Sequence, residues 1–402
     1  MKNSNWGSMY RQIGVEPVIN AIGNVSVLGG SIASPQVRAA MEAASDAFAP
    51  MLETAEAAGA AVAEMLGVDA AWITSGAGSA IALSTAACMA GDDPERIAQL
   101  PDTKGLRNEF IIQARQRYTY DRCLEVSGGR IIEAGTQTPV SDGVNRTTGA
   151  EHHAKGKEAP GTSEDDLVDT IGNRTAAIHY VADTRVHDPN LLSFEQVLQV
   201  AKNHNVPIIV DAAGQVYPTE NLRSYAAAGA SLVCYGAKYI QAPHSTGFVA
   251  GEKDLVHAVS RQSFAAFETL GLRAIGRPHK VDRQEMIGVV AAVREWLTMN
   301  HEDRFATYDA RIKTITEHIG THQGLSVTAQ RETVGGSSYG VLLEIDPEQS
   351  PISLQQLVDA LKAGSPPVWT RVVGGRMLIA VNCLSDGEDE MVGTRIAQVL
   401  NT

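Results

Sequence analysis

The sequence predicts an α/β protein with a doubly wound, mostly parallel β-sheet, followed by a smaller α+β domain. Short apolar runs alternate with helical patterns from about residue 70 to residue 250, which is the order of elements in such a sheet. Beyond Gly251 this alternation gives way to long helices and then to separate strands. We therefore expect an N-terminal segment at 1–45, a large domain at 46–275 and a C-terminal domain at 276–402.

Composition and charge narrow the class of protein. The chain has 402 residues, of which 44% are hydrophobic and 20% are charged, so it can bury a large core. Its formal net charge of −13 argues against a nucleic acid or an anionic membrane as its main partner. No apolar run approaches the length that spans a bilayer, and the N-terminus lacks the pattern of a signal peptide, so we expect a cytoplasmic protein. The four cysteines are far apart, which is typical of buried thiols in a reducing compartment.

The first part of the chain predicts a strand and two helices. Residues 17–35 begin as a short apolar strand and continue into a glycine-rich loop. Ser34, followed by a proline at the first helical position, indicates the start of an alanine-rich helical stretch that runs to about Leu66. Pro50 divides this stretch into two helices, whose small residues suit close packing against a neighbour or a second subunit.

Residues 70–91 have the order of parts that a phosphate-binding cradle requires. A short strand is followed by Ser75, Gly76, Ala77, Gly78 and Ser79, and then by an apolar helix. Backbone N–H groups at a helix N-terminus, with hydroxyls beside them, can bind a phosphate group. A tight turn without a ligand is the alternative, because short glycine motifs often occur without one.

Residues 109–134 predict a strand, a helix and a second strand. Tyr118, Tyr120 and Arg122 fall where the first strand meets the helix. An aromatic ring there could either stack on a planar ligand or simply pack at the rim. Residues 141–163 are polar and rich in glycine and charge, which predicts a loop or an insertion. The His152–His153 pair in it lacks the spacing and acidic companions of a metal site, so no metal is expected.

The stretch 207–251 carries the strongest functional signal. The apolar run that ends in Asp211 predicts a buried central strand, and Ser231–Tyr235 predicts a second one. Lys238 follows the second strand after two small residues. Because the carboxyl ends of neighbouring parallel strands share one crevice, Asp211 and Lys238 can meet at a single ligand.

A lysine and an aspartate placed in this way suit pyridoxal 5'-phosphate. The lysine amine binds the aldehyde of this cofactor covalently, and the carboxylate keeps the ring nitrogen protonated. The cradle from Ser75 to Ser79 supplies a third anchor, for the phosphate. The alternative is an ordinary strand-end Asp211 with a solvated Lys238, which two single residues do not exclude.

The remainder of the chain predicts the second domain. We expect helices at 253–265, 282–300, 303–321 and 352–364, and strands near 323–330, 338–345 and 376–382. The sequence contains no internal repeat and no low-complexity tract.

Taken together, the motifs resemble those of the fold-type-I pyridoxal-phosphate enzymes of the selenocysteine synthase (L-seryl-tRNA selenium transferase) group. The resemblance rests on SGAGS before a helix, IIVDAAGQVYPTENL and SLVCYGAKYIQAPHSTGFVAG. INAIGNV, YDRCLEVSGGRIIEAGTQ and GRPHKVDRQEMIG are most similar to the D-glucosaminate-6-phosphate ammonia-lyase branch. The resemblance covers nearly the whole chain, and its most specific part runs from Asp211 to Gly251.

The resemblance implies a role for several residues. Lys238 becomes the Schiff-base lysine and Asp211 the partner of the pyridinium nitrogen, while Ser75 to Ser79 form the phosphate cup. Tyr120 or a neighbour becomes a ring-stacking candidate, and Tyr235 belongs with the cofactor-binding residues.

Substrate contacts are implied in the same way. Arg371 lies where this group has an arginine in its small domain, so it could bind a substrate carboxylate, although a surface arginine on a strand is an equal alternative. Where the ammonia-lyase branch usually has Gly-Gly-Lys and then Arg-Gly-Pro-Gln, this chain has Gly-Ala-Lys238 and then Gln241-Ala242-Pro243-His244. Gln241 is a candidate substrate contact. His244 could act as the acid for a leaving hydroxyl or as a hydrogen-bonding spacer.

The resulting prediction is a lyase that removes ammonia from a β-hydroxy amino acid or an amino sugar acid by α,β-elimination. A racemase or an aldolase uses the same lysine and aspartate, and an aminotransferase shares the fold and cofactor. The expected partner is a small-molecule amino acid, with no nucleic acid or membrane. The resemblance also implies a homodimer or a larger homo-oligomer.

Overall fold

The computed structural model describes residues 6–135, 161–182, 188–331 and 339–401. It divides into a large unit, residues 33–297, and a small unit, which combines residues 1–32 with residues 298–402. Each unit is described by itself. The domain limits expected at residues 45 and 275 stay a prediction, because a compact unit is not the same as a domain that folds alone.

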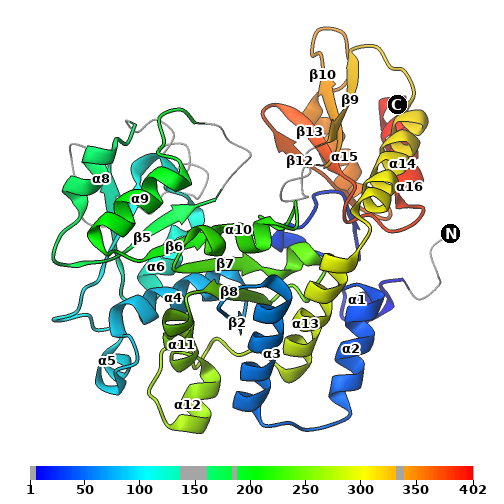
Figure 1. The fold of residues 1–402 in the computed structure, drawn as a ribbon. Helices are drawn as coiled ribbons and strands as arrows, with labels where there is room; N and C mark the ends of the chain where they lie inside the picture. The colour runs from blue at the N-terminus through cyan, green and yellow to red at the C-terminus, as the bar shows by residue number, and fades with distance from the viewer. Residues whose placement is uncertain (1–5, 136–160, 183–187, 332–338, 402) are drawn as a thin grey trace. The chain divides into compact units, whose positions relative to one another are not determined.

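The large unit is built on a seven-stranded sheet (Figure 1). Across the sheet the strand order is β2 (Ala70–Thr74), β8 (Gly247–Gly251), β7 (Leu232–Gly236), β6 (Ile208–Asp211), β5 (Thr175–Val181), β3 (Glu109–Gln113) and β4 (Arg130–Ala134). Only β8 runs antiparallel to its two neighbours. The carboxyl ends of the six parallel strands therefore share one edge, and β8 starts at that edge.

Helices cover both faces of this sheet. In Figure 1, α8 (Glu164–Thr170), α9 (Phe194–His204) and α10 (Asn221–Ala228) lie above it, and α4 (Ala77–Ala90), α5 (Pro94–Gln99), α6 (Arg122–Val126) and α11 (Lys253–Arg261) lie below. The other helices of the large unit are α2 (Pro35–Ser45), α3 (Met51–Leu66), α12 (Phe264–Leu270) and α13 (Arg283–Thr298). Because both faces are covered, β6 and β7 are buried along their whole length.

Local signals explain where the helices begin and end. Ser34 caps α2 by accepting a hydrogen bond from the Val37 N–H, with Pro35 as the first helical residue. The helix expected over 253–265 is two helices in the structure, α11 and α12. Ser263 caps the second of these, accepting from the Ala266 N–H at 3.2 Å. A serine that follows two polar residues thus begins a new helix here.

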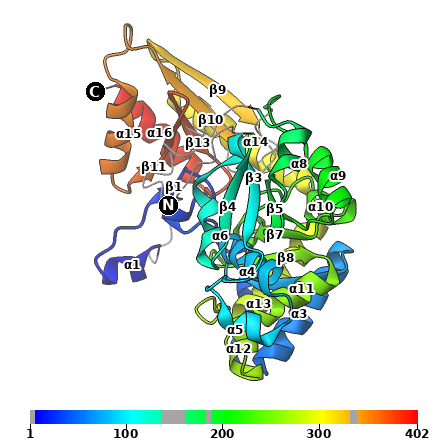
Figure 2. The same cartoon turned by 90° about the vertical axis from the view of Figure 1, so that its left-hand side faces the viewer.

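The small unit has two layers (Figure 2). Its four-stranded antiparallel sheet has the order β12 (Arg371–Val373), β13 (Arg376–Ala380), β10 (Tyr339–Ile345) and β9 (Leu325–Arg331). α14 (His301–Ile319), α15 (Leu354–Ala363) and α16 (Glu388–Leu400) pack against it around a shared apolar core. The N-terminal segment supplies α1 (Ser8–Gln12) and β1 (Ile19–Asn20), and β1 pairs in parallel with β11 (Val368–Trp369).

The predicted alternation of strands and helices around a mostly parallel sheet, followed by an α+β region, is confirmed. None of the helices in the described ranges has the length and apolar character needed to span a membrane.

Candidate active site

Asp211 and Lys238 lie at the same edge of the large sheet. Asp211 ends β6 and is paired with Cys234 on β7, and Lys238 follows the end of β7 by two residues. The turn after Asp211 is bonded to β7, because the Gly236 N–H donates to the Ala213 carbonyl at 3.0 Å. The strand order therefore places the carboxylate and the amine on adjacent strand ends, as the sequence indicated.

The loop that carries Lys238 also meets the start of α4. Lys238 lies in a 3-10 turn, Ala237–Ile240, and the chain then enters β8 at Gly247. A Cβ added to Gly247 would lie 2.7 Å from the Gly76 carbonyl carbon, so only glycine allows this approach. The lysine loop and the SGAGS turn are consequently in direct backbone contact.

The N-terminus of α4 is open for an anion. No side chain in the described residues caps this helix, whose N-cap residue, Gly76, has a φ of 93°. A Cβ on Gly76 would meet nothing within 4 Å among the atoms that the structure describes. First-turn N–H groups that lack a cap are available to a ligand, and the helix dipole favours a negative one.

Two serines and a histidine line this helix start. Ser75 Oγ lies 2.9 Å from Ser79 Oγ, and Ser79 Oγ lies 2.7 Å from His279 Nδ1. Burial lowers the pKa of His279, so its ring is neutral near pH 7. The sequence analysis did not single out His279, because 200 residues separate it from Ser79 and no local pattern connects the two.

Asp211 is buried, with 7% of its surface exposed, and its carboxylate has protein donors. The Tyr118 hydroxyl donates to Oδ2, and the Ala213 N–H donates to Oδ1 at 3.0 Å. His179 Nε2 lies 3.2 Å from the same Tyr118 hydroxyl, and the two rings are stacked with an interplanar angle of 16°. These two donors hold the carboxylate in one orientation.

His244 lies close enough to Lys238 to be affected by its charge. Burial and the Lys238 ammonium both lower the pKa of His244. His244 Nδ1 is buried and has no hydrogen-bond partner in the part of the chain that the structure describes. A buried ring nitrogen without a partner beside a lysine indicates a position where a ligand atom can bind.

The two tyrosines predicted to bind the cofactor, Tyr120 and Tyr235, differ in their exposure to solvent. Tyr120 is 64% exposed, and it is its neighbour Tyr118 that contacts Asp211. Tyr235 is fully buried, and its hydroxyl donates to the Asn221 carbonyl at 2.8 Å. Their cofactor roles remain predictions.

The predicted substrate contacts also remain predictions. Gln241 has a φ of 61°, and its carbonyl accepts from the Ser34 N–H at 3.2 Å. Arg371 begins β12 of the small unit. The His152–His153 pair and most of the 141–163 loop lie outside the described residues.

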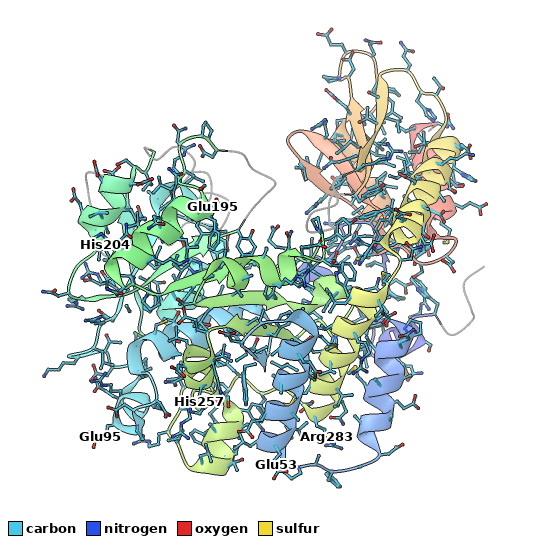
Figure 3. All side chains as sticks on the ribbon, viewed as in Figure 1. Glu53, Glu95, Glu195, His204, His257 and Arg283 are labelled. Carbon is cyan, nitrogen blue, oxygen red and sulfur yellow. The ribbon has the colours of Figure 1, made fainter. Side chains whose placement is uncertain are left out.

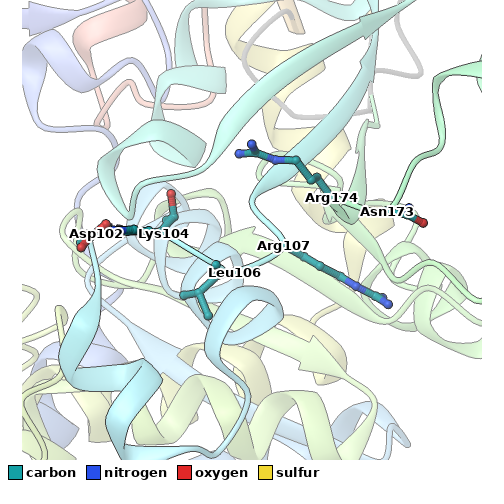
Figure 4. Close-up of a pocket in the computed structure, with 8 residues that line it drawn as sticks. Asp102, Lys104, Leu106, Arg107, Asn173 and Arg174 are labelled. Carbon is teal, nitrogen blue, oxygen red and sulfur yellow. Dashed lines mark hydrogen bonds between the residues drawn. The ribbon is translucent and has the colours of Figure 1, made fainter.

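In the described ranges, no group of three or more His, Cys, Asp or Glu side chains is arranged to hold a metal ion. Most of the side chains labelled in Figure 3 lie on helices at the surface of the large unit, such as Glu195 and His204 on α9. A cavity of about 510 Å³ is lined by residues 102–107, Asn173 and Arg174, which precede β3 and β5 and so lie at the opposite edge of the sheet (Figure 4). Its two arginines, Arg107 and Arg174, point away from each other.

These features fit pyridoxal phosphate. Lys238 can bind an aldehyde, Asp211 can hold a protonated ring nitrogen, and the uncapped α4 with Ser75 and Ser79 can hold a phosphate.

Comparisons with known proteins agree with a pyridoxal-phosphate enzyme. No family model matches the chain. A 5'-C-glycyluridine monooxygenase-decarboxylase from a Streptomyces species is 31% identical over 402 aligned positions, which cover 97% of this chain and 92% of that protein. The D-glucosaminate-6-phosphate ammonia lyase of Salmonella typhimurium (strain 14028s / SGSC 2262) is 26% identical, and 98% of each chain is covered.

Solved structures extend the comparison. A structure of D-glucosaminate-6-phosphate ammonia-lyase superposes with a TM-score of 0.81 at 25% identity, covering 100% of this chain and 99% of that one. Sphingomonas wittichii serine palmitoyltransferase gives a TM-score of 0.51 at 14% identity, with 95% and 86% covered, which is a likeness of fold alone. The chain is therefore a fold-type-I enzyme. More narrowly, it belongs to the family of the 5'-C-glycyluridine monooxygenase-decarboxylase, and the predicted resemblance to D-glucosaminate-6-phosphate ammonia-lyase is confirmed.

Proposed function

We propose that this protein is a pyridoxal-phosphate-dependent lyase that removes ammonia from a β-hydroxy amino acid or an amino sugar acid by α,β-elimination. The observation that carries the proposal is the meeting of Asp211, the Lys238 loop and the uncapped α4 at one sheet edge. The relatives named as ammonia-lyases, which match along almost the entire chain, support the reaction class.

Each residue would have a defined task. Bound pyridoxal phosphate supplies an electron sink for the negative charge that develops at the substrate α carbon. Lys238 Nζ holds the cofactor at rest and, once released, accepts the α proton. Asp211, oriented by the Tyr118 hydroxyl and the Ala213 N–H, would bind the ring nitrogen in its protonated form. The β-hydroxyl leaves as water, and a second water replaces the amino group, which leaves as ammonia.

His244 is the proposed proton donor for the leaving hydroxyl. Its ring lies near Lys238, and its Nδ1 has no partner in the described chain, so a substrate hydroxyl could bind there. The positive charge of Lys238 lowers the pKa of His244. When the lysine is uncharged this repulsion is absent, and the imidazole holds a proton more readily at neutral pH.

A second reaction is favoured by one observation. The relative named a monooxygenase-decarboxylase is more similar in sequence, at 31% identity, than the ammonia lyase, at 26%. Such an activity would consume O₂ and release CO₂ from the amino acid, whereas elimination needs no oxygen. Racemisation, aldol cleavage and transamination use the same lysine and aspartate and are separated by their products.

The wider assignments remain proposals. We propose a homodimer or larger homo-oligomer in the cytoplasm, as the sequence analysis expected, and membership of the wider selenocysteine synthase group. We also propose Arg371 and Gln241 as substrate contacts and Tyr120 and Tyr235 as cofactor contacts. Light scattering during size-exclusion chromatography tests the oligomer directly.

The experiment for the function starts with the absorbance spectrum of protein reconstituted with pyridoxal phosphate. We expect a visible band that is lost in Lys238→Ala and kept in Lys313→Ala, a control at an exposed lysine. D- and L-β-hydroxy amino acids, D-glucosaminate and its 6-phosphate are then supplied with and without O₂. Ammonia and a 2-oxo acid formed without O₂ support the lyase, and O₂-dependent CO₂ release supports the second reaction. A wild-type protein with no visible band would exclude both.

A further inference from the structure

A chain of three side chains runs along the start of α4, from Ser75 through Ser79 to His279. The Oγ atoms of the serines are 2.9 Å apart, and Ser79 Oγ is 2.7 Å from His279 Nδ1. Both distances are those of ordinary hydrogen bonds. This inference rests on the proposed function, in which Ser75 and Ser79 border the phosphate of the cofactor.

The direction of these hydrogen bonds decides whether a serine can bind phosphate. A phosphate group accepts hydrogen bonds, so it needs a free hydroxyl proton. If His279 Nδ1 accepts from Ser79, the two hydroxyl protons are used in the Ser79–His279 and Ser75–Ser79 bonds, and none remains. If His279 Nδ1–H donates to Ser79, three protons serve three bonds, and one serine hydroxyl is left for the phosphate.

The backbone holds His279 in place for this contact. Its N–H donates to the Gly276 carbonyl at 2.8 Å, and the Gly276 N–H donates to the Gln262 carbonyl at 3.0 Å. A Cβ on Gly276 would clash with that Gln262 carbonyl oxygen and approach Leu83 of α4 at 3.0 Å. The turn that carries His279 is therefore fixed close to α4.

We propose that His279 is a positioning residue of the phosphate cup, whose Nδ1–H donates to Ser79 and thereby leaves one serine hydroxyl proton for the cofactor phosphate. His279 itself need not contact the cofactor. The proposal extends the predicted cup, which consisted of residues 75–79, by a residue from a distant segment of the same unit.

A comparison of how the protein binds two forms of the cofactor distinguishes a role of His279 at the phosphate from a general effect on the fold. Dissociation constants are measured for pyridoxal 5'-phosphate and for pyridoxal, which lacks the phosphate, by the absorbance of the lysine-bound cofactor. In His279→Ala and His279→Gln one serine proton is still free, but Ser79 Oγ loses the donor that fixes its position, so we expect pyridoxal phosphate to bind up to about tenfold more weakly, the effect of at most one hydrogen bond. Binding of pyridoxal should stay within about twofold of wild type. His279→Asn, whose amide nitrogen can take the place of Nδ1, should stay within about threefold for both.

Ser79→Ala tests the same Ser79–His279 contact if a His279 variant folds poorly. In this variant Ser75 keeps its proton but loses the hydroxyl contact that positions it, so we expect a comparable loss for pyridoxal phosphate alone, and the His279→Ala change should add nothing further in the Ser79→Ala background. The direction of the bond is tested by nitrogen NMR of ¹⁵N-histidine-labelled holoenzyme. The His279 signal, assigned by its absence from His279→Asn, should show a protonated Nδ1.

Three results would overturn the inference. These are equal weakening of pyridoxal and pyridoxal phosphate, no difference between the asparagine and glutamine variants, and an unprotonated Nδ1 in the holoenzyme. A wild-type protein that binds neither compound would instead reject the proposed function, and this inference with it.

Discussion

At the residue scale, the buried carboxylate of Asp211 depends on the Tyr118 hydroxyl. Tyr118→Phe removes a donor from a buried charged group while keeping the ring that stacks on His179. A hydrogen bond to a buried charge contributes about 1.5–3 kcal/mol, so we expect the free energy of unfolding of the cofactor-free protein to fall by that amount. Urea denaturation measures it.

The matched control is Tyr120→Phe, two residues away and 64% exposed. It should change the free energy of unfolding by less than about 0.5 kcal/mol. Equal effects in the two variants would show that the Tyr118 hydroxyl has no special importance for Asp211.

His179 gives a pH dependence with a definite sign. It is 1% exposed, and burial lowers its pKa below the ordinary value of 6.5, an effect that the nearby carboxylates of Asp211 and Asp121 partly oppose. Below pH 6.5 His179 therefore binds a proton in the unfolded chain but stays unprotonated in the folded protein. The free energy of unfolding consequently falls as the pH falls. One such histidine contributes at most about 1.4 kcal/mol per pH unit.

We expect His179→Gln to reduce the slope of unfolding free energy against pH between about pH 5 and 6.5. His204→Gln, at an exposed position on α9, serves as the control and should leave the slope unchanged. Urea denaturation at several pH values provides the slopes. A His179→Gln slope as steep as that of wild type would mean that other groups carry the acid sensitivity.

At the scale of elements, α3 shows why a helical glycine can be required. Gly59 faces β2, and a Cβ there would clash with the carbonyl oxygen of Ala71. Alanine normally stabilises a helix by about 1 kcal/mol relative to glycine. In this position the contact is with backbone, which cannot move aside as a side chain can, so we expect Gly59→Ala to destabilise the protein by about 1–3 kcal/mol.

Ala57→Gly, at an exposed position of the same helix, provides the comparison. It should cost only the difference in helix propensity, about 1 kcal/mol. Thermal unfolding of both variants tests the pair, and a Gly59→Ala protein that is more stable than wild type would show that α3 and β2 can separate without cost.

Sequence patterns predicted some residues of the site and missed others. Asp211, Lys238 and the SGAGS turn were found because each follows a buried apolar run, and parallel strands bring such ends together. The contacts made by Tyr118, one of the aromatic residues at the predicted strand–helix junction, and by His279 could not be found in this way. Their partners, Asp211 and Ser79, lie 93 and 200 residues away, and such contacts depend on how separate elements pack. The break between α11 and α12 was missed because a single capping serine decided it.

At the scale of the whole molecule, the N-terminal segment is part of the small unit although the rest of that unit begins at residue 298. Ile19 pairs with Val368, and the Ala380 N–H donates to the Ala21 carbonyl at 2.8 Å. No sequence pattern indicated this pairing, since two-residue strands more than 300 positions apart carry no periodicity.

Ile19 is the residue through which this segment stabilises the small unit. Its side chain is 1% exposed and belongs to the apolar core that includes Val341 and Ile379. Removing most of a buried isoleucine side chain costs about 2–5 kcal/mol through lost burial and the cavity that remains. We therefore expect Ile19→Ala to increase amide hydrogen exchange in β10 and β13, because both strands line that core.

The same variant should leave β6 and β7 as protected as in wild type, since both strands belong to the large unit and Ile19 belongs to the small one. Val27→Ala, in the same N-terminal segment but at a side chain that is 64% exposed, should change neither unit. Hydrogen exchange followed by mass spectrometry resolves the two sets of strands in one experiment. If Ile19→Ala exposes β6 and β7 as strongly as β10 and β13, the two units unfold together and the N-terminal strand stabilises the entire chain. If only β10 and β13 respond, the first 32 residues stabilise the unit that carries Arg371 independently of the sheet that carries Lys238.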